Sequence, residues 1–444
     1  MDEHDVRYCV LHTWKGLPEA LSSDLDIAVH PQDREKLPAV FETLRELGFS
    51  PIQCQHYAVE GYAFVFAWFS GSDFRSLKLD VVFAYRPCAS VQIPGEQLVA
   101  GRVRHKGFWI AHPSTAFRYL LIKKTVKRDI QSLQSQQLSE LVDGIGRSSA
   151  ETIAAELFGE RWKVRIVDSC SNGTLGALLP WLRGSLRRIS IAHKPIRTTS
   201  HFFSNSVRLI GRWFQPTGVC LVVLGPDGVG KTTLVGRLAD ELRPAFDGQE
   251  IFHFRPEFLA PKAAAQTPEV NPHGAEPRRT GRSLAHLLGF FADYWLGYLL
   301  RIRPAMARSS LIIFDRSFHD LVIDRRRYRY GGPLRLPRLL ARFAPPFGAL
   351  FLVLDADENA ILSRKREIAP NELKRLRSAY VNFASVVSPA ALIRTDGRAD
   401  DSSSASLRAI SGHLAGRFER RHATWLAPDA PPTDETKPRQ ATQF

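Results

Sequence analysis

The segment with the clearest chemical meaning runs from Gly225 to Thr232 and reads GPDGVGKT. It matches the pattern G-x-x-x-x-G-K-[ST], in which glycines let backbone N–H groups point inward around a β-phosphate. Lys231 is then expected to reach the β- and γ-oxygens, and the Thr232 hydroxyl to ligate Mg²⁺. The pattern therefore predicts a binding site for ATP and Mg²⁺ made of Gly225, Asp227, Gly228, Val229, Gly230, Lys231, Thr232 and Thr233.

Two further groups of charged residues suit the same chemistry. Asp315 and Arg316 follow the apolar run 311–314, where an Asp can hold Mg²⁺ and an Arg can clamp a phosphate through two hydrogen bonds. Arg364 and Arg366 follow the apolar run 349–354 and can fold over a nucleotide as a lid that stabilises charge on a transferred phosphoryl group. The alternatives are a simple strand-end ion pair and an exposed basic helix face.

A second set of carboxylates lies near the N-terminus. Asp24 and Asp26 are two residues apart, which on a strand puts both side chains on one face, and Asp80 lies in a second strand-like run, 77–83. Three carboxylates on adjacent strands can bind two Mg²⁺ ions that activate a hydroxyl for attack on an NTP α-phosphate. The alternative is that Asp24 and Asp26 end a strand and pair with arginines.

The elements that must position these residues can be read from the apolar pattern. From residue 216 onward, apolar strands at 219–224, 311–314 and 349–354 alternate with helical stretches such as 233–242. This alternation predicts an α/β domain, a parallel sheet between two layers of helices. The Pro- and Ala-rich stretch 256–281 has no periodicity and is expected to be a long functional loop.

The residues of this part resemble the thymidylate kinase family over roughly 218–415. GPDGVGKTT resembles the family's phosphate loop, Asp315-Arg316 its Asp-Arg motif, and His253-Phe254-Arg255-Pro256 its Arg-Glu-Pro segment without the Glu. The resemblance implies that Arg255 and Arg316 bind the acceptor's monophosphate and that Asp227 contacts its sugar. Because the loop lacks Arg, it also implies that Lys231 and Arg316 act in catalysis with the lid residues Arg364 and Arg366. The segment 317–332 departs from the family and leaves the acceptor open.

The N-terminal region resembles polymerase-beta-like nucleotidyltransferases through its Asp-hydrophobic-Asp pair and its later single Asp. The resemblance implies an α+β domain in which Asp24, Asp26 and Asp80 hold metal. It departs at Gly16-Leu17, where the superfamily has Gly-Ser or Gly-Gly before the pair. A working transferase, a degenerate binding module and a structural relic all stay open.

Length and composition bound the whole chain. The 444 residues carry a formal charge of +15, which suits polyanionic partners such as nucleotides. We expect a nucleotidyltransferase-like domain at 1–165, a basic linker at 166–215, a phosphate-loop domain at 216–424 and a disordered tail at 425–444. The five scattered cysteines and the acidic N-terminus without an apolar core favour a reducing, cytoplasmic location.

These features predict an ATP-dependent kinase, similar to thymidylate kinases, that phosphorylates a nucleotide or a related small molecule. The alternative is an NTP-hydrolysing switch protein with a degenerate nucleotidyltransferase-like module. Peripheral membrane contact through the basic linker and a homodimer are both compatible with the sequence, as is a linker lying on an acidic patch of its own protein. Nucleic acid is a disfavoured partner, because no motif for binding it is present.

Overall fold

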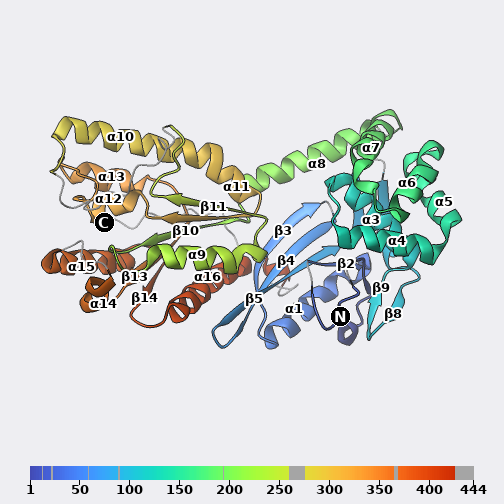
Figure 1. Cartoon of the computed structure of the whole chain (residues 1–444), viewed down its shortest axis with the longest axis horizontal. Helices are drawn as coiled ribbons and strands as arrows, with labels where there is room; N and C mark the ends of the chain where they lie inside the picture. Colours follow the sequence, from blue (N-terminus) through green and yellow to red (C-terminus); the bar gives the residue numbers. More distant parts are fainter. Residues whose placement is uncertain are drawn as a thin grey trace. The chain divides into compact units, whose positions relative to one another are not determined.

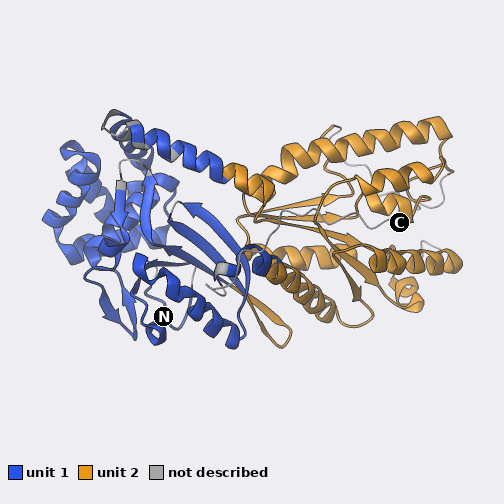
Figure 2. Cartoon of the chain, turned by 180° about the vertical axis from the view of Figure 1, so that it is seen from behind, with its two compact units in different colours: residues 1–66, 77–208, 417–444 blue, residues 67–76, 209–416 orange. Residues whose placement is uncertain are grey.

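The structure is a computed structural model that describes residues 1–444 except 13, 22–23, 59, 89–90, 194, 260–275, 365–368 and 426–444. The chain divides into two compact units, coloured separately in Figure 2. Unit 1 holds residues 1–66, 77–208 and 417–444, and unit 2 holds 67–76 and 209–416. Each unit has its own sheet and is described by itself.

Unit 2 is built on a sheet of five parallel strands in the order β11-β12-β10-β13-β14. Every residue of the three central strands is buried, as expected for a parallel sheet covered on both faces. The predicted α/β architecture is thus confirmed for this part, and the predicted run 219–224 coincides with β10. The strands are β10 (Val219–Leu224), β11 (Gly248–His253), β12 (Ser310–Asp315), β13 (Leu350–Asp355) and β14 (Ala390–Arg394).

Helices lie on both sides of this sheet, with α10 and α11 on one side and α9 and α16 on the other in Figure 1. The apolar run 287–300 forms the end of α10 and the start of a π-helical turn, Tyr298–Ile302. The helices are α9 (Lys231–Leu242), α10 (Thr280–Gly297), α11 (Arg303–Ala307), α12 (Phe318–Ile323), α13 (Arg335–Arg342), α14 (Glu358–Arg364), α15 (Pro370–Val386) and α16 (Ala399–Arg421).

Unit 1 contains a mixed sheet of seven strands in the order β3-β4-β5-β2-β1-β9-β8. Strands β2 and β5 are parallel neighbours, whereas β1 and β2 run antiparallel. A separate ribbon pairs β6 with β7. The strands are β1 (Tyr8–Val10), β2 (Leu25–Val29), β3 (Ser50–Ala58), β4 (Gly61–Ser70), β5 (Asp73–Val82), β6 (Ala84–Cys88), β7 (Val91–Pro94), β8 (Val103–His105) and β9 (Phe108–Ile110).

Helix α1 contributes to one core cluster of unit 1, and helices α2 to α7 contribute to another. The helices are α1 (Leu37–Glu46), α2 (Gly95–Val99), α3 (Pro113–Lys127), α4 (Ser132–Ile145), α5 (Arg147–Phe158), α6 (Lys163–Ser171), α7 (Leu179–His193) and α8 (Pro195–Phe214). Leu179, Leu182 and Leu186 of α7 are buried in the second of these clusters. This differs from the predicted separate linker at 166–215, because an apolar residue every three to four positions packs α7 into unit 1.

The C-terminal boundary also differs from the predicted one. Residues after 416 belong to unit 1, and Trp425 is buried against aromatic side chains of that unit, among them Phe41 and Phe64. Burying a large aromatic side chain is favourable, so Trp425 packs in unit 1 although the sequence around it is polar. The remainder of the predicted tail, 426–444, lies outside the described residues.

Two smaller features bear on the predicted environment. Cys9, Cys54, Cys170 and Cys220 are buried free thiols. Among the described residues, no helix combines the length and the apolar character needed to cross a bilayer.

Candidate active site

The loop after β10 has the backbone conformation that its glycines were predicted to supply. Gly225, Gly228 and Gly230 have φ values of 149°, 85° and 100°, which residues with a Cβ rarely adopt. A Cβ on Gly225 would also lie 2.8 Å from the carbonyl oxygen of Leu354. α9 begins at Lys231, so the loop presents the positive end of that helix to a ligand.

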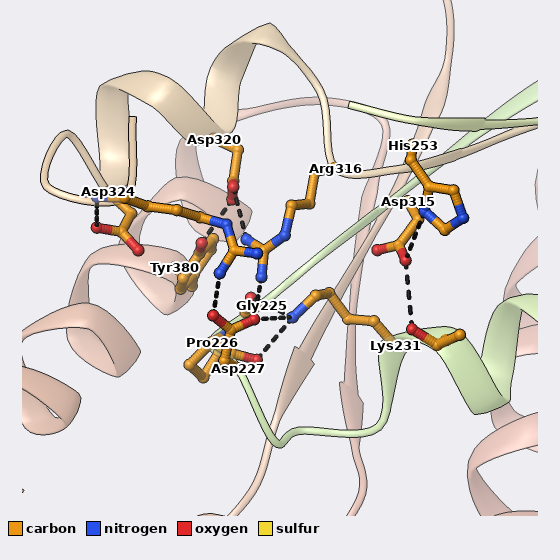
Figure 3. Close-up of polar contacts among 12 residues, drawn as sticks. Gly225, Pro226, Asp227, Lys231, His253, Asp315, Arg316, Asp320, Asp324 and Tyr380 are labelled. Carbon is orange, nitrogen blue, oxygen red and sulfur yellow. Dashed lines mark hydrogen bonds and ion pairs between the residues drawn. The ribbon is translucent and has the colours of Figure 1, made fainter. Parts of the chain in front are cut away.

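Lys231 lies inside this loop (Figure 3). Its Nζ donates hydrogen bonds to the carbonyl oxygens of Gly225, at 2.9 Å, and Pro226, at 2.7 Å. It also lies 3.6 Å from a carboxylate oxygen of Asp227. Burial, and next the charge of Arg316, lower the pKa of the Lys231 ammonium to about 7. Anionic phosphate oxygens beside Lys231 would restore its charge.

Asp315 ends β12 next to the loop. Its Oδ2 lies 3.4 Å from the Thr232 hydroxyl and 3.3 Å from Nδ1 of His253, and its Oδ1 is buried with no hydrogen-bond partner among the described residues. Burial opposes ionisation, but the hydrogen bond from His253 and the nearby charges of Lys231 and Arg316 give a net lowering of the pKa of the Asp315 carboxyl. A charged carboxylate beside a hydroxyl fits the oxygen ligands that Mg²⁺ prefers.

Arg316 connects this region to the next segment of the chain. It adopts a left-handed backbone conformation, φ 76°, and its N–H donates to the Val223 carbonyl oxygen at 3.0 Å. Its guanidinium donates to Oδ2 of Asp320 at 2.6 Å and to Oδ1 of Asp227, whose Oδ2 accepts from Arg327. Asp227 therefore pairs with two arginines. The structure brings Asp227, Arg316 and Arg327 together, and their predicted or proposed contacts with an acceptor stay predictions.

Asp320 of α12 binds the Arg316 guanidinium on the side away from Asp227 (Figure 3). It is fully buried, and besides Arg316 it accepts hydrogen bonds from the hydroxyls of Tyr328, at 2.7 Å, and Tyr380, at 2.5 Å. Three donors satisfy the buried carboxylate, so Arg316 is held in place. The sequence analysis missed Asp320, Arg327 and the tyrosines. Three of them lie in 317–332, the segment that departs from the thymidylate kinase pattern.

Arg255 follows β11 at the same edge of the sheet. The Phe254 ring before it stacks on Tyr328 at a centroid distance of 4.4 Å, and Arg255 lies 5.6 Å above the ring of Phe290. Asp293 of α10 fixes the following turn, because its carboxylate accepts from backbone N–H groups at 3.1 and 2.6 Å. Asp293 is the charged residue of the apolar run 287–300, and its role depends on these tertiary contacts.

A pocket of about 240 Å³ opens beside the start of α9. Its lining includes Thr233, Arg364 and Gly397. Arg364 donates to the Thr395 carbonyl oxygen at 2.7 Å, and the Thr395 hydroxyl donates to the carbonyl oxygen of Val229 at 2.8 Å. Arg364 thus contacts the wall of this pocket, and its predicted role in phosphoryl transfer stays a prediction. Arg366 lies outside the described residues.

Two of the three N-terminal carboxylates lie on neighbouring strands of unit 1, with Asp26 of β2 directly opposite Asp80 of β5, and Asp24 directly precedes β2. Asp26 accepts from Lys123 and lies 2.9 Å from Nε2 of His12, while Asp24 pairs with a lysine of β5. The described residues contain no group of three His, Cys, Asp or Glu side chains arranged to hold a metal. The proposed metal-binding role of these three residues stays a prediction.

The loop, its lysine and the carboxylate of β12 lie at the carboxyl ends of parallel strands, where ligands of such sheets bind. These features define unit 2 as a phosphate-loop nucleotide-binding domain. No family model matches the chain. A thymidylate kinase of Xanthomonas euvesicatoria pv. vesicatoria (strain 85-10) is 32% identical over 170 residues, covering 36% of this chain and 67% of that protein. Through this part of its length, the chain belongs to the thymidylate kinase family.

Solved thymidylate kinase structures also match. The enzyme of Ehrlichia chaffeensis is 19% identical with a TM-score of 0.32 and covers 44% of this chain and 98% of its own. The enzyme of Candida albicans is 16% identical with a TM-score of 0.33, with coverages of 45% and 93%. The family assignment rests on the Xanthomonas protein, and it supports a kinase activity at the level of the family.

Proposed function

We propose that unit 2 transfers the γ-phosphoryl group of MgATP to the phosphate of a nucleoside monophosphate, with thymidylate as the first acceptor to test. The observation that carries the proposal is the convergence of Lys231, Asp315 and Arg316 at one edge of the sheet, next to the phosphate loop. A nucleotide-binding switch needs the loop and the metal ligands. It does not need the buried Arg316 and the half-buried Arg327 and Arg255 beside them.

The donor would bind along the loop. Its phosphates would accept from backbone N–H groups and from Lys231, while Thr232 and Asp315 would hold Mg²⁺, which neutralises charge on the phosphate oxygens. The pocket lined by Thr233, Arg364 and Gly397 is adjacent to the first turn of α9, which suits a base or ribose of the donor. The guanidinium of Arg364 would face that part of the nucleotide.

The acceptor phosphate would bind to arginines that now pair with Asp227. Arg316 and Arg327 each donate to one oxygen of that carboxylate, and a phosphate dianion offers the same geometry with more charge. The acceptor would therefore compete for both guanidinium groups and release Asp227 to contact the acceptor sugar. Phe254, stacked on Tyr328, supplies an aromatic surface beside Arg255 on which a base can lie.

The chemical step needs little covalent participation by the protein. An oxygen of the acceptor phosphate forms a bond to the γ-phosphorus, the bond to the β–γ bridging oxygen breaks, and ADP leaves with the electron pair. The attacking oxygen is already ionised, so no base is required. Lys231 and the arginines stabilise the charge on the transferred group, and the fixed loop aligns the two oxygens.

An acceptor screen tests this function. The full chain with MgATP is given nucleoside monophosphates, nucleosides and sugars, and the products are followed by ADP release and mass spectrometry. We expect a phosphorylated nucleoside monophosphate, with the diphosphate of thymidine as the leading product. ADP release without any phosphorylated acceptor would contradict the proposal and favour a hydrolytic switch.

A pair of variants distinguishes the acceptor site from general effects on the fold. Arg327→Gln removes one of the two cations on Asp227, whereas Arg325→Gln changes an exposed arginine two residues away. We expect the first to raise the acceptor KM about 10-fold or more, in line with the loss of a charged hydrogen bond, with little change in the KM for ATP. The second should leave both values unchanged.

A further inference from the structure

The part of helix α8 that belongs to unit 1, up to Arg208, exposes large apolar side chains. Ile196, Phe202, Phe203 and Val207 are 84%, 73%, 69% and 52% exposed. The spacing from Ile196 to Phe203 to Val207, seven and then four residues, puts three of them on one face of the helix. The same spacing continues along the helix to Ile210 and Phe214. Such a row of apolar side chains indicates a surface that contacts a partner.

The formal charges along this stretch of the chain all have one sign. No Asp or Glu occurs between Asp168 and Asp227. Arg187 and Arg188 of α7 are exposed, and Arg208 lies within α8. A helix with a strong apolar face in an exclusively basic stretch of chain is typical of segments that lie in a membrane interface.

A basic pocket lies at the beginning of α7. It has a volume of about 390 Å³ and is lined by three arginines and two tryptophans, without an acidic residue. Arg161 and Arg165 lie 5.5 and 6.0 Å from the ring of Trp162, and Trp181 is 68% exposed. No carboxylate among the described residues pairs with Arg161, Arg165 or Arg188. Three like charges at one pocket repel one another, so an anion there would be stabilised.

From these two observations we propose that α7 and α8 bind the surface of an anionic phospholipid bilayer. α8 lies parallel to that surface with Ile196, Phe203 and Val207 at the boundary of the acyl chains. The arginines of the pocket bind a lipid phosphate, and Trp181 sits at the level of the headgroups, where indole rings are enriched. The proposal is independent of the acceptor of unit 2.

Charge and composition favour this occupant over the others. A second copy of the chain would bring an identical basic surface against this one, and the like charges would repel. Nucleic acid would match the arginines but would leave the apolar row of α8 in water. An anionic bilayer satisfies both features at once.

Vesicle co-sedimentation of the full chain tests the proposal. Vesicles of phosphatidylcholine alone are compared with vesicles in which a third of the lipid is phosphatidylglycerol. We expect binding at least 10-fold tighter to the anionic vesicles, weakened by salt and not displaced by millimolar inorganic phosphate. Equal binding to both kinds of vesicle would contradict the proposal. Displacement by inorganic phosphate would contradict it too, and would indicate a binding site for a soluble phosphate.

Three variants assign the effect to residues. Phe203→Ser with Val207→Ser removes part of the apolar row, and Arg161→Gln with Arg165→Gln removes charge from the pocket. Each pair is expected to weaken vesicle binding at least 10-fold while phosphoryl transfer stays unchanged. Leu133→Ser is the matched control, since Leu133 is 52% exposed on α4 and should have no effect. Unchanged vesicle binding by the Phe203→Ser, Val207→Ser variant would overturn the proposal. So would gel filtration that finds the wild type as a dimer and this variant as a monomer.

Discussion

The phosphate-loop site of unit 2 and the acidic cluster of unit 1 are built from similar parts. Each has one aspartate that pairs with more than one basic side chain, the half-buried Asp227 in unit 2 and the buried Asp26 in unit 1. Each also has a second aspartate, Asp315 or Asp80, with a buried carboxylate oxygen that has no partner among the described residues. The pKa of this second aspartate is nevertheless lowered in unit 2 and raised in unit 1.

The difference lies in what surrounds the second aspartate. At Asp315, a hydrogen bond from His253 and the charge of Lys231 outweigh burial and lower the pKa. At Asp80, burial and the negative charge of Asp26 raise the pKa of the carboxyl to about 7. Near neutral pH, Asp315 is therefore charged, as its proposed role as a metal ligand requires, while Asp80 holds a proton for part of the time. The same residue type serves two purposes because of its neighbours.

The largest expected effects come from replacing the two buried lysines, Lys231 of unit 2 and Lys123 of unit 1. Lys231→Met removes the cation that the transferred phosphoryl group needs, so kcat should fall about 10²–10³-fold. Lys123→Met leaves the buried Asp26 without its ion-pair partner, which costs about 3–5 kcal/mol of stability. Steady-state kinetics and thermal unfolding of both variants measure these effects.

The comparison predicts that one variant loses activity and keeps stability, while the other loses stability and keeps activity. Lys231→Met should stay folded, because burial already disfavours the charged form of this side chain and lowers its pKa to about 7. Lys123→Met, at temperatures where it stays folded, should keep its phosphoryl-transfer rate. Full activity in Lys231→Met would mean that the phosphate-loop assignment is wrong.

Asp80 offers the next test, through the pH dependence of stability. Its folded pKa of about 7 exceeds the unfolded value, so the folded state binds more protons and stability is lost as pH rises from about 4 to 7. Asp80→Asn removes this loss. Its stability relative to the wild type should therefore increase by about 2–3 kcal/mol between pH 5 and pH 8. Thermal or urea unfolding at both pH values measures the difference, and a constant difference would show that Asp80 is not buried in its neutral form.

Sequence reasoning succeeded where the chemistry lies within one short segment. The phosphate loop, β10 and the Asp315-Arg316 pair were predicted because an uninterrupted apolar strand leads directly into residues with a defined spacing. Arg327 was missed because its partner Asp227 is 100 residues away and the turn that brings them together has no characteristic pattern. The burial of Trp425 was missed for the same reason, since the segment around it is polar and its contacts are all distant in sequence.

A third test concerns the metal site. Asp315→Asn keeps the shape of the carboxyl group and removes its charge, so the Mg²⁺ concentration for half-maximal activity should rise about 10- to 100-fold. Asp80→Asn is the matched control in unit 1 and should leave the Mg²⁺ dependence of phosphoryl transfer unchanged. An identical Mg²⁺ dependence for Asp315→Asn and the wild type would remove Asp315 from the set of metal ligands.

The smallest effect is a proton taken up by Lys231 when nucleotide binds. With a pKa of about 7 in the free site, this side chain is only about one tenth charged at pH 8, and phosphate oxygens next to Nζ raise its pKa. Binding of MgADP should therefore take up about 0.9 proton at pH 8 and about 0.1 at pH 6. Calorimetric titrations in two buffers of different ionisation enthalpy give this number directly. Lys231→Met should abolish the uptake, and an uptake in the wild type that does not change with pH would place the proton on another group.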